Sequence, residues 1–132
     1  MRQVSGFTLI ELLVIVAIVA ILATIGIPAY TGFVQKTARA DAMAALWDVR
    51  LEQEKYRMTN PTYAVTLSSL GVDATTPNGK YAISIDSAGA GSFTALAAPQ
   101  GTQTGDTSCG TFAINQNGPL HTGYANATCW KR

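Results

Sequence analysis

The sequence predicts an α+β fold in which one long N-terminal helix lies across a small antiparallel sheet. The helix is indicated by an almost uninterrupted apolar run over residues 7–27, followed by apolar residues spaced three and four apart as far as residue 58. Three shorter runs after residue 79 alternate apolar and polar side chains, as strands with one buried face do. Only the helix is long enough to cover that face.

The apolar run is long enough to cross a membrane. As a helix, residues 7–27 would extend about 31 Å at roughly 1.5 Å per residue, which matches the hydrocarbon core of a bilayer. A secretory signal peptide has a shorter apolar core and a small-residue cleavage site after it, and this sequence has neither. We therefore expect a membrane segment, with Arg2 on the cytoplasmic side.

The second half of the predicted helix is amphipathic. Its apolar positions are Val34, Ala38, Ala42, Ala45, Leu46, Val49 and Tyr56. Its polar positions, which we expect to be solvated, are Lys36, Arg39, Asp41, Asp48, Arg50, Glu52 and Lys55. Gly26 and Pro28 lie between the two halves, and Pro28 lacks a backbone donor, so we expect a bend or a local break there. The Asn60-Pro61 pair should end the helix, because a proline steers the preceding residue out of the helical region.

The expected strands cover residues 80–86, 92–98 and 110–115, with turns at residues 88–91 and 117–119. Cys109 and Cys129 both follow the second strand. In a chain whose membrane segment exports its C-terminal part, they indicate one structural disulfide. A redox catalyst would more often carry Cys-x-x-Cys, and two cysteines with one histidine are too few for a zinc site.

Composition and charge favour no ligand. The formal net charge is +1, so no strong field would attract nucleic acid or anionic lipid. His121 has no cluster of cysteines or carboxylates near it in the sequence, and no pattern of nucleophile, base and orienting residue is present. We therefore expect no enzymatic activity, no cofactor and no metal. Trp130-Lys131-Arg132 is thin evidence for a DNA contact, and a solvated terminus is the favoured interpretation.

Glu11 is the one charged residue in the apolar run. A carboxylate in a membrane-spanning segment is costly and usually has a partner, yet the run contains no Lys, Arg or His. A cut just before Phe7 would create an α-amine four residues from Glu11, within reach of one helical turn or of an adjacent copy. Glu11 would also lie near the positive end of the helix dipole. Such a cut would explain why the carboxylate is present.

The segment Gly6-Phe7-Thr8-Leu9-Ile10-Glu11 resembles the prepilin processing motif of type IV pilins and related pseudopilins. The resemblance implies that a prepilin peptidase cleaves between Gly6 and Phe7 and methylates Phe7. It also implies that Glu11 pairs with a terminal amine during filament assembly. Residues 36–63 are similar to the post-membrane helix of PilE-type minor pilins, and Cys109, Cys129 and Trp130 are similar to their disulfide-bounded C-terminal region.

This resemblance implies the type IV pilin fold in three segments: a leader over 1–6, a transmembrane and filament-core helix over 7–28, and a globular head over 29–132. It implies a structural, minor subunit of a type IV pilus with a role in pilus biogenesis, twitching motility or adhesion. The precursor would lie in the bacterial inner membrane with its head in the periplasm, and the mature subunit in the extracellular pilus.

The implied partners are other pilin subunits, the prepilin peptidase and the inner-membrane assembly machinery. Two alternatives remain open. One is a pseudopilin of a type II secretion system, which would share the processing motif. The other is a membrane-anchored binding module that never polymerises, with DNA or a host surface as its ligand. For a polymerising subunit, a nucleic-acid contact at the filament tip is the less favoured interpretation.

Overall fold

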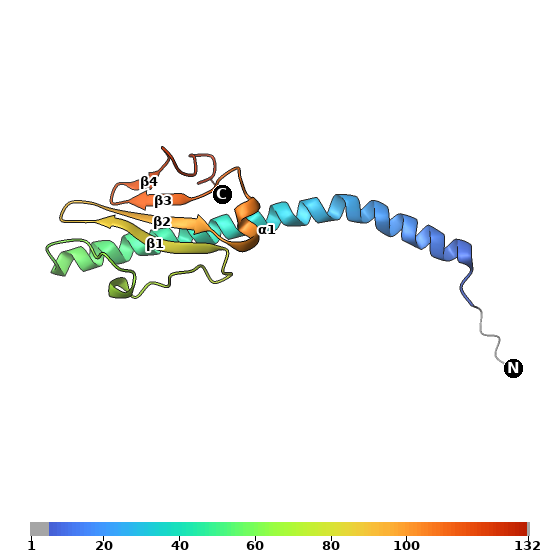
Figure 1. The fold of residues 1–132 in the computed structure, drawn as a ribbon, viewed down its shortest axis with the longest axis horizontal. Helices are drawn as coiled ribbons and strands as arrows, with labels where there is room; N and C mark the ends of the chain where they lie inside the picture. Colours follow the sequence, from blue (N-terminus) through green and yellow to red (C-terminus); the bar gives the residue numbers. More distant parts are fainter. Residues whose placement is uncertain (1–5, 132) are drawn as a thin grey trace. The chain divides into compact units, whose positions relative to one another are not determined.

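A computed structural model describes residues 6–131, so the predicted positions of Arg2 and Arg132 lie outside the described residues. The chain divides into two compact units, Met1–Val34 and Gln35–Arg132. Helix α1, Leu9–Thr59, is 51 residues long and contributes to both units (Figure 1). The second unit, which we call the head, also contains four strands and two short 3-10 turns. The segment boundary at residue 28 remains a prediction.

Helix α1 confirms the predicted helix over residues 7–58. It contains Pro28 in its interior, so the expected local break is not seen, and the expected bend remains a prediction. The hydroxyl of Thr31 donates to the Pro28 carbonyl oxygen at 2.9 Å. The helix ends at Thr59, directly before Asn60-Pro61, as predicted. The Asn60 side-chain amide donates to the Tyr56 carbonyl oxygen at 2.9 Å and thereby satisfies one acceptor of the last turn.

The sheet is antiparallel, with the strand order β1-β2-β3-β4. Strands β1 (Tyr81–Ala88), β2 (Phe93–Pro99) and β3 (Phe112–Asn115) confirm the three predicted strands. Strand β4, Gly118–Leu120, corrects the prediction of a turn over residues 117–119. Its central residue is a proline, which a strand at the edge of a sheet tolerates because it pairs on one side only.

The two edges of the sheet are irregular. At the β1 edge, the register with β2 shifts between Ile85 and Ser87, which leaves Asp86 in a bulge. The segment before β1 covers part of the same edge: Thr75 bridges Ala82, and the Ile83 amide donates to the Ala74 carbonyl oxygen at 2.8 Å. At the other edge, β4 is only three residues long.

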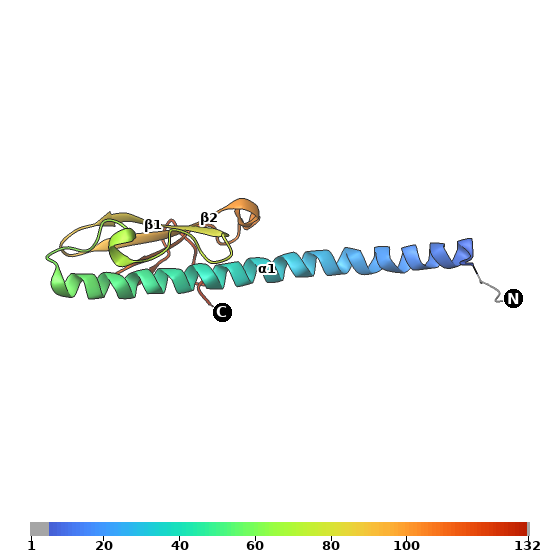
Figure 2. The same cartoon turned by 90° about the horizontal axis from the view of Figure 1, so that it is seen from below.

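The head confirms the predicted α+β fold, because α1 runs along one face of the sheet (Figure 2). One stripe of the helix is buried there: Ala38, Ala42, Met43, Leu46, Val49 and Gln53. The sheet contributes Tyr81, Ile83, Phe93, Ala95, Ala97, Phe112 and Ile114. Cys109 and Cys129 form the predicted disulfide, which spans 20 residues and includes β3 and β4 in its loop. The C-terminal region is thereby fastened to the core.

Arg39 corrects the expectation that all the polar side chains of the helix are solvated. Its Nε and Nη2 atoms each lie 2.6 Å from a carboxylate oxygen of Asp106, whose side chain is 1% exposed. The buried side chain of Gln103 donates to the same carboxylate at 3.1 Å and to the Tyr81 hydroxyl at 3.2 Å. The pattern gave no sign of this because Asp106, the partner of Arg39, is 67 residues away along the chain.

Candidate functional site

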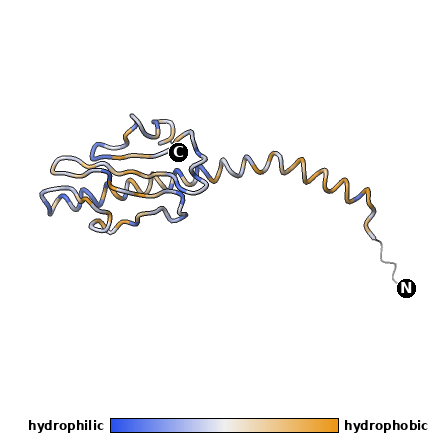
Figure 3. The backbone as a smooth tube through the Cα atoms, in the orientation of Figure 1, coloured by the Kyte–Doolittle hydropathy of each residue, from blue (hydrophilic) through white to orange (hydrophobic). Residues whose placement is uncertain are grey.

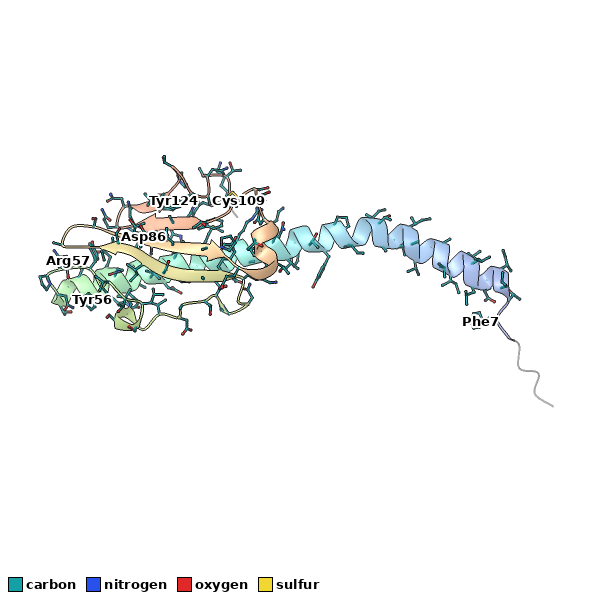
Figure 4. All side chains as sticks on the ribbon, in the orientation of Figure 1. Phe7, Tyr56, Arg57, Asp86, Cys109 and Tyr124 are labelled. Atoms are coloured by element: carbon teal, nitrogen blue, oxygen red, sulfur yellow. A yellow bond between two sulfur atoms is a disulfide. The ribbon has the colours of Figure 1, made fainter. Side chains whose placement is uncertain are left out.

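The bond between Gly6 and Phe7 lies just before α1 in irregular backbone. Both residues are exposed, Phe7 to 77%, and a Cβ atom placed on Gly6 would meet no other atom within 4 Å. Figure 4 shows Phe7 at the start of the helix, with its side chain away from other elements. A peptidase needs an accessible stretch of chain, and residues 6–8 are exposed and precede the helix, so access to this bond does not require α1 to unfold.

Thr8 and Glu11 form the start of the helix. The Glu11 amide donates to the Thr8 hydroxyl oxygen at 3.3 Å, and the Leu12 amide donates to the Thr8 carbonyl oxygen at 3.2 Å. Threonine at the N-cap with glutamate three residues later is the pattern of a capping box, and an anion in the first turn is favoured by the helix dipole. Our sequence reasoning missed Thr8, although its signal, Thr-x-x-Glu, is present.

The first unit exposes an apolar surface. Figure 3 shows hydrophobic residues along the N-terminal half of α1. The exposed large side chains between Leu9 and Phe33 are Leu9, Ile10, Leu12, Leu13, Val14, Ile15, Val16, Ile18, Val19, Ile21, Leu22, Ile25, Ile27, Tyr30 and Phe33. By length and composition, α1 is the one described helix that could cross a membrane. Among residues 6–34, Glu11 carries the only charge. This surface needs an apolar cover, whether lipid or neighbouring helices.

The other predicted site residues are the two at the expected helix bend and the two cysteines. Gly26 and Pro28 are in the interior of α1, and Cys109 and Cys129 fasten the C-terminal region of the head. Side chains packed within the head have shifted pKa values. Burial raises the pKa of the Tyr81 phenol, and the hydrogen bond to Asp106 raises the pKa of Arg39. Neither change poises a group for proton transfer near neutral pH.

The potential metal ligands among the described residues do not gather in one place. Within residues 6–131, no group of three or more His, Cys, Asp or Glu side chains is placed to hold a metal ion. The ring Nδ1 atom of His121 lies 3.2 Å from the Ala125 carbonyl oxygen. The Trp130 ring packs edge to face on Phe112, with centroids 5.4 Å apart, and is therefore engaged by the core instead of being presented to a base.

The chain matches two protein-family models, which together cover residues 1–113. Residues 1–27 match the model described as the prokaryotic N-terminal methylation motif. Residues 28–113 match the model described as type IV minor pilin ComP, DNA uptake sequence receptor. The chain belongs to the type IV minor pilin family. This pilin combines the methylation motif with an exposed apolar helix and a head whose C-terminal region is held by a disulfide.

Individual relatives agree. The pilin is 38% identical to the type IV wide pilus major component PilA4 of Thermus thermophilus, over 76% of its own chain and 78% of the relative. It is 34% identical to the fimbrial protein EcpC of Eikenella corrodens, over 69% of its own chain and 60% of the relative. The match to the type II secretion system core protein G of Dickeya chrysanthemi is weaker, 29% over 53% of this chain and 46% of the relative.

These matches confirm the expectation of a pilus subunit over that of a secretion pseudopilin. The pilin is a structural subunit, made as an inner-membrane precursor and then incorporated into an extracellular type IV pilus. The methylation motif indicates processing by a prepilin peptidase, and the family indicates assembly with other pilins.

Proposed function

We propose that this pilin is a minor subunit that is cleaved between Gly6 and Phe7, methylated on Phe7 and polymerised through residues 7–28. Residues 1–6 would be its leader and residues 29–132 its globular head. The observation that carries this proposal is that Glu11 is the only charge among residues 6–34, on a helix whose apolar side chains are exposed.

The proposed mechanism depends on one helix serving two apolar environments in turn. In the membrane, Glu11 lies at the end of the helix, where the cost of a carboxylate is smaller than at the centre of the bilayer. In the filament core, an unpaired carboxylate would be costly, whereas one placed beside the Phe7 amine of a neighbouring copy would be compensated. The pairing would therefore select the correct stagger between adjacent copies.

The primary experiment is mass spectrometry of the N-terminal peptide from protein purified from cells. The proposal predicts a peptide that begins with N-methylated Phe7. A peptide that begins at Met1, in cells with an active prepilin peptidase, would make this an anchored module and would remove the basis for a role of Glu11 in assembly.

A pair of variants separates the assembly role of Glu11 from its position in the helix cap. Glu11→Gln removes the charge and keeps the shape, so we expect normal membrane insertion and loss of this pilin from the filaments. Thr8→Val removes the cap hydroxyl and keeps the Glu11 charge, so we expect filaments to form, since a lost cap costs only about 1 kcal/mol. Equal filament yields from Glu11→Gln and wild type would contradict the proposed pairing.

We further propose that the pilin has no catalytic activity and requires no cofactor. DNA reception, which the family description names, is less favoured for this chain. Five of its nine basic residues are engaged within the head, two lie outside the described residues, and only Lys36 and Lys131 are uncommitted. A DNA-binding surface usually neutralises several phosphates. A deletion strain that keeps its pili but loses DNA uptake would reverse this preference; loss of the pili themselves would support the structural role.

A further inference from the structure

Most charged side chains of the head are already bonded within it. The basic ones that are engaged are Arg39, Arg50, Lys55, Arg57 and Lys80, and the acidic ones are Asp41, Glu52, Glu54 and Asp106. Among residues 35–131, the charged side chains without a hydrogen bond or ion pair are Lys36, Lys131, Asp48, Asp73 and Asp86. Exposed charges that have no internal partner remain available to a neighbour.

Four of these five charges line two grooves. The first, which we call the lysine groove, has a volume of about 640 Å³ and is bounded by Lys36 and Met43 of α1 and by Lys131 of the C-terminal segment. The second, which we call the aspartate groove, has a volume of about 530 Å³ and is bounded by Asp48 of α1 and by Asp73 of the segment before β1. Each groove thus has a helix wall and a segment wall.

The two grooves lie on opposite flanks of the head. At 3.6 residues per turn, the sides of α1 that carry Lys36 and Asp48 fall on either side of its buried stripe. The segment walls lie at opposite edges of the sheet, because the segment before β1 bridges β1 and the C-terminal segment follows β4 (Figure 1). One flank therefore carries uncompensated positive charge and the other uncompensated negative charge.

We propose that the lysine groove of one copy docks on the aspartate groove of the next, with Lys36 opposite Asp48 and Lys131 opposite Asp73. Copies placed side by side in the same orientation bring helix wall to helix wall and segment wall to segment wall. A contact between two different surfaces does not close into a dimer but propagates, and complementary charge fixes its register. This contact rests on the proposed polymerising function and names the partner as a second copy of this chain.

The pairing also defines an axial offset between neighbouring heads. Lys36 and Asp48 are twelve residues apart on one helix, which corresponds to about 18 Å at 1.5 Å per residue. Level placement of Lys36 beside a neighbour's Asp48 therefore displaces these two copies by about that distance along α1. This neighbour differs from the one whose Phe7 amine meets Glu11, because four residues correspond to only about 6 Å. The long apolar stem of lysine allows its ammonium group to enter the facing groove while the backbones stay apart.

The test is a charge swap in the full chain, expressed in cells. The measured quantity is the amount of this pilin in the filaments sheared from the cells. We expect Lys36→Glu with Lys131→Glu to lower this amount about tenfold, because two attractive pairs become repulsive. Adding Asp48→Lys and Asp73→Lys to the same chain should restore the yield to within about twofold of wild type. The matched control replaces Asp73→Lys by Asp86→Lys, which gives the same net charge at an exposed site outside both grooves (Figure 4). That control should remain defective.

Each outcome decides the proposal. Non-reducing gels and membrane fractions verify that each variant accumulates with its disulfide intact. An unchanged filament yield in the lysine variant, or failure of the four-residue swap to restore it, would refute the contact. Normal filaments with lost DNA uptake in the lysine variant would assign these lysines to nucleic acid and also refute it. Absence of the wild-type protein from filaments would refute the polymerising function itself, and the contact with it.

Discussion

Replacing Arg39 by methionine should destabilise the head strongly. The Asp106 side chain is 1% exposed and accepts two hydrogen bonds at 2.6 Å from the guanidinium and one at 3.1 Å from Gln103. Arg39→Met removes both bonds from the guanidinium and leaves a buried carboxylate with one neutral donor. Removal of one partner from a buried ion pair typically costs about 3 to 5 kcal/mol of the free energy of unfolding.

The assay is equilibrium unfolding in urea of the full chain in detergent micelles, with the disulfide oxidised. Tryptophan fluorescence reports on the head because Trp47 and Trp130 both lie in it and the Trp130 ring packs on Phe112. With a urea dependence of about 1.5 kcal/mol per molar, the expected loss lowers the midpoint of unfolding by about 2 to 3 M. Removing both charges, by Arg39→Met with Asp106→Leu, should recover most of this loss because no buried charge is left unpaired.

The matched control is the other ion pair of the described chain. Lys55 Nζ lies 2.5 Å from a carboxylate oxygen of Glu52, and the lysine side chain is 56% exposed. Lys55→Met should therefore cost at most about 1 kcal/mol. If Arg39→Met costs no more than Lys55→Met, the view of Asp106 as a buried charge that depends on its partner is wrong.

Three further effects are expected. Gln53→Leu should cost about 1 to 3 kcal/mol in the same urea assay, because the buried amide exchanges two hydrogen bonds at 2.8 Å with the backbone of Ala64; unchanged stability would contradict this. Cys109→Ser with Cys129→Ser should lower the free energy of unfolding by about 3 kcal/mol relative to the wild type without reductant. The wild type measured with reductant is the control, and a double variant as stable as the oxidised wild type would count against a structural disulfide. Burial raises the pKa of Tyr81, so the folded state favours the protonated phenol; its stabilising contribution is complete below about pH 10 and is lost as the pH rises through the raised value. Alkaline titration of the midpoint of unfolding should therefore be flatter in Tyr81→Phe, and an equally steep titration would argue against this origin.

The elements of the fold could be predicted because their signals are local. The apolar run, the spacing up to residue 58 and Asn60-Pro61 determined the extent of α1, and alternation located β1 to β3. Strand β4 could not be predicted, since Gly118 and Pro119 suit a turn equally well and only pairing with β3 makes them a strand.

The residues of the candidate site and the grooves also differ in whether their signal is local in the sequence. Gly6, Phe7 and Glu11 stand close together in the sequence, so the resemblance to the prepilin motif could be seen there, and the processing and assembly roles that it implies stay predictions. The bonding of Arg39 to Asp106 and the two grooves arise only when residues far apart along the chain meet. A helical spacing shows which side of α1 is polar, but it does not show which of the polar side chains acquire a partner there.

The irregular sheet edges have a consequence for a protein that must accumulate at high local density. An open, regular edge strand invites strand addition by another copy and, with repetition, amyloid. Here the bulge at Asp86 and the bridge from Thr75 interrupt the β1 edge, and Pro119 in a three-residue β4 removes a donor from the other. The head can therefore be crowded against its own copies with little risk of cross-β aggregation, which leaves helix packing and side-chain contacts to determine the order of the fibre.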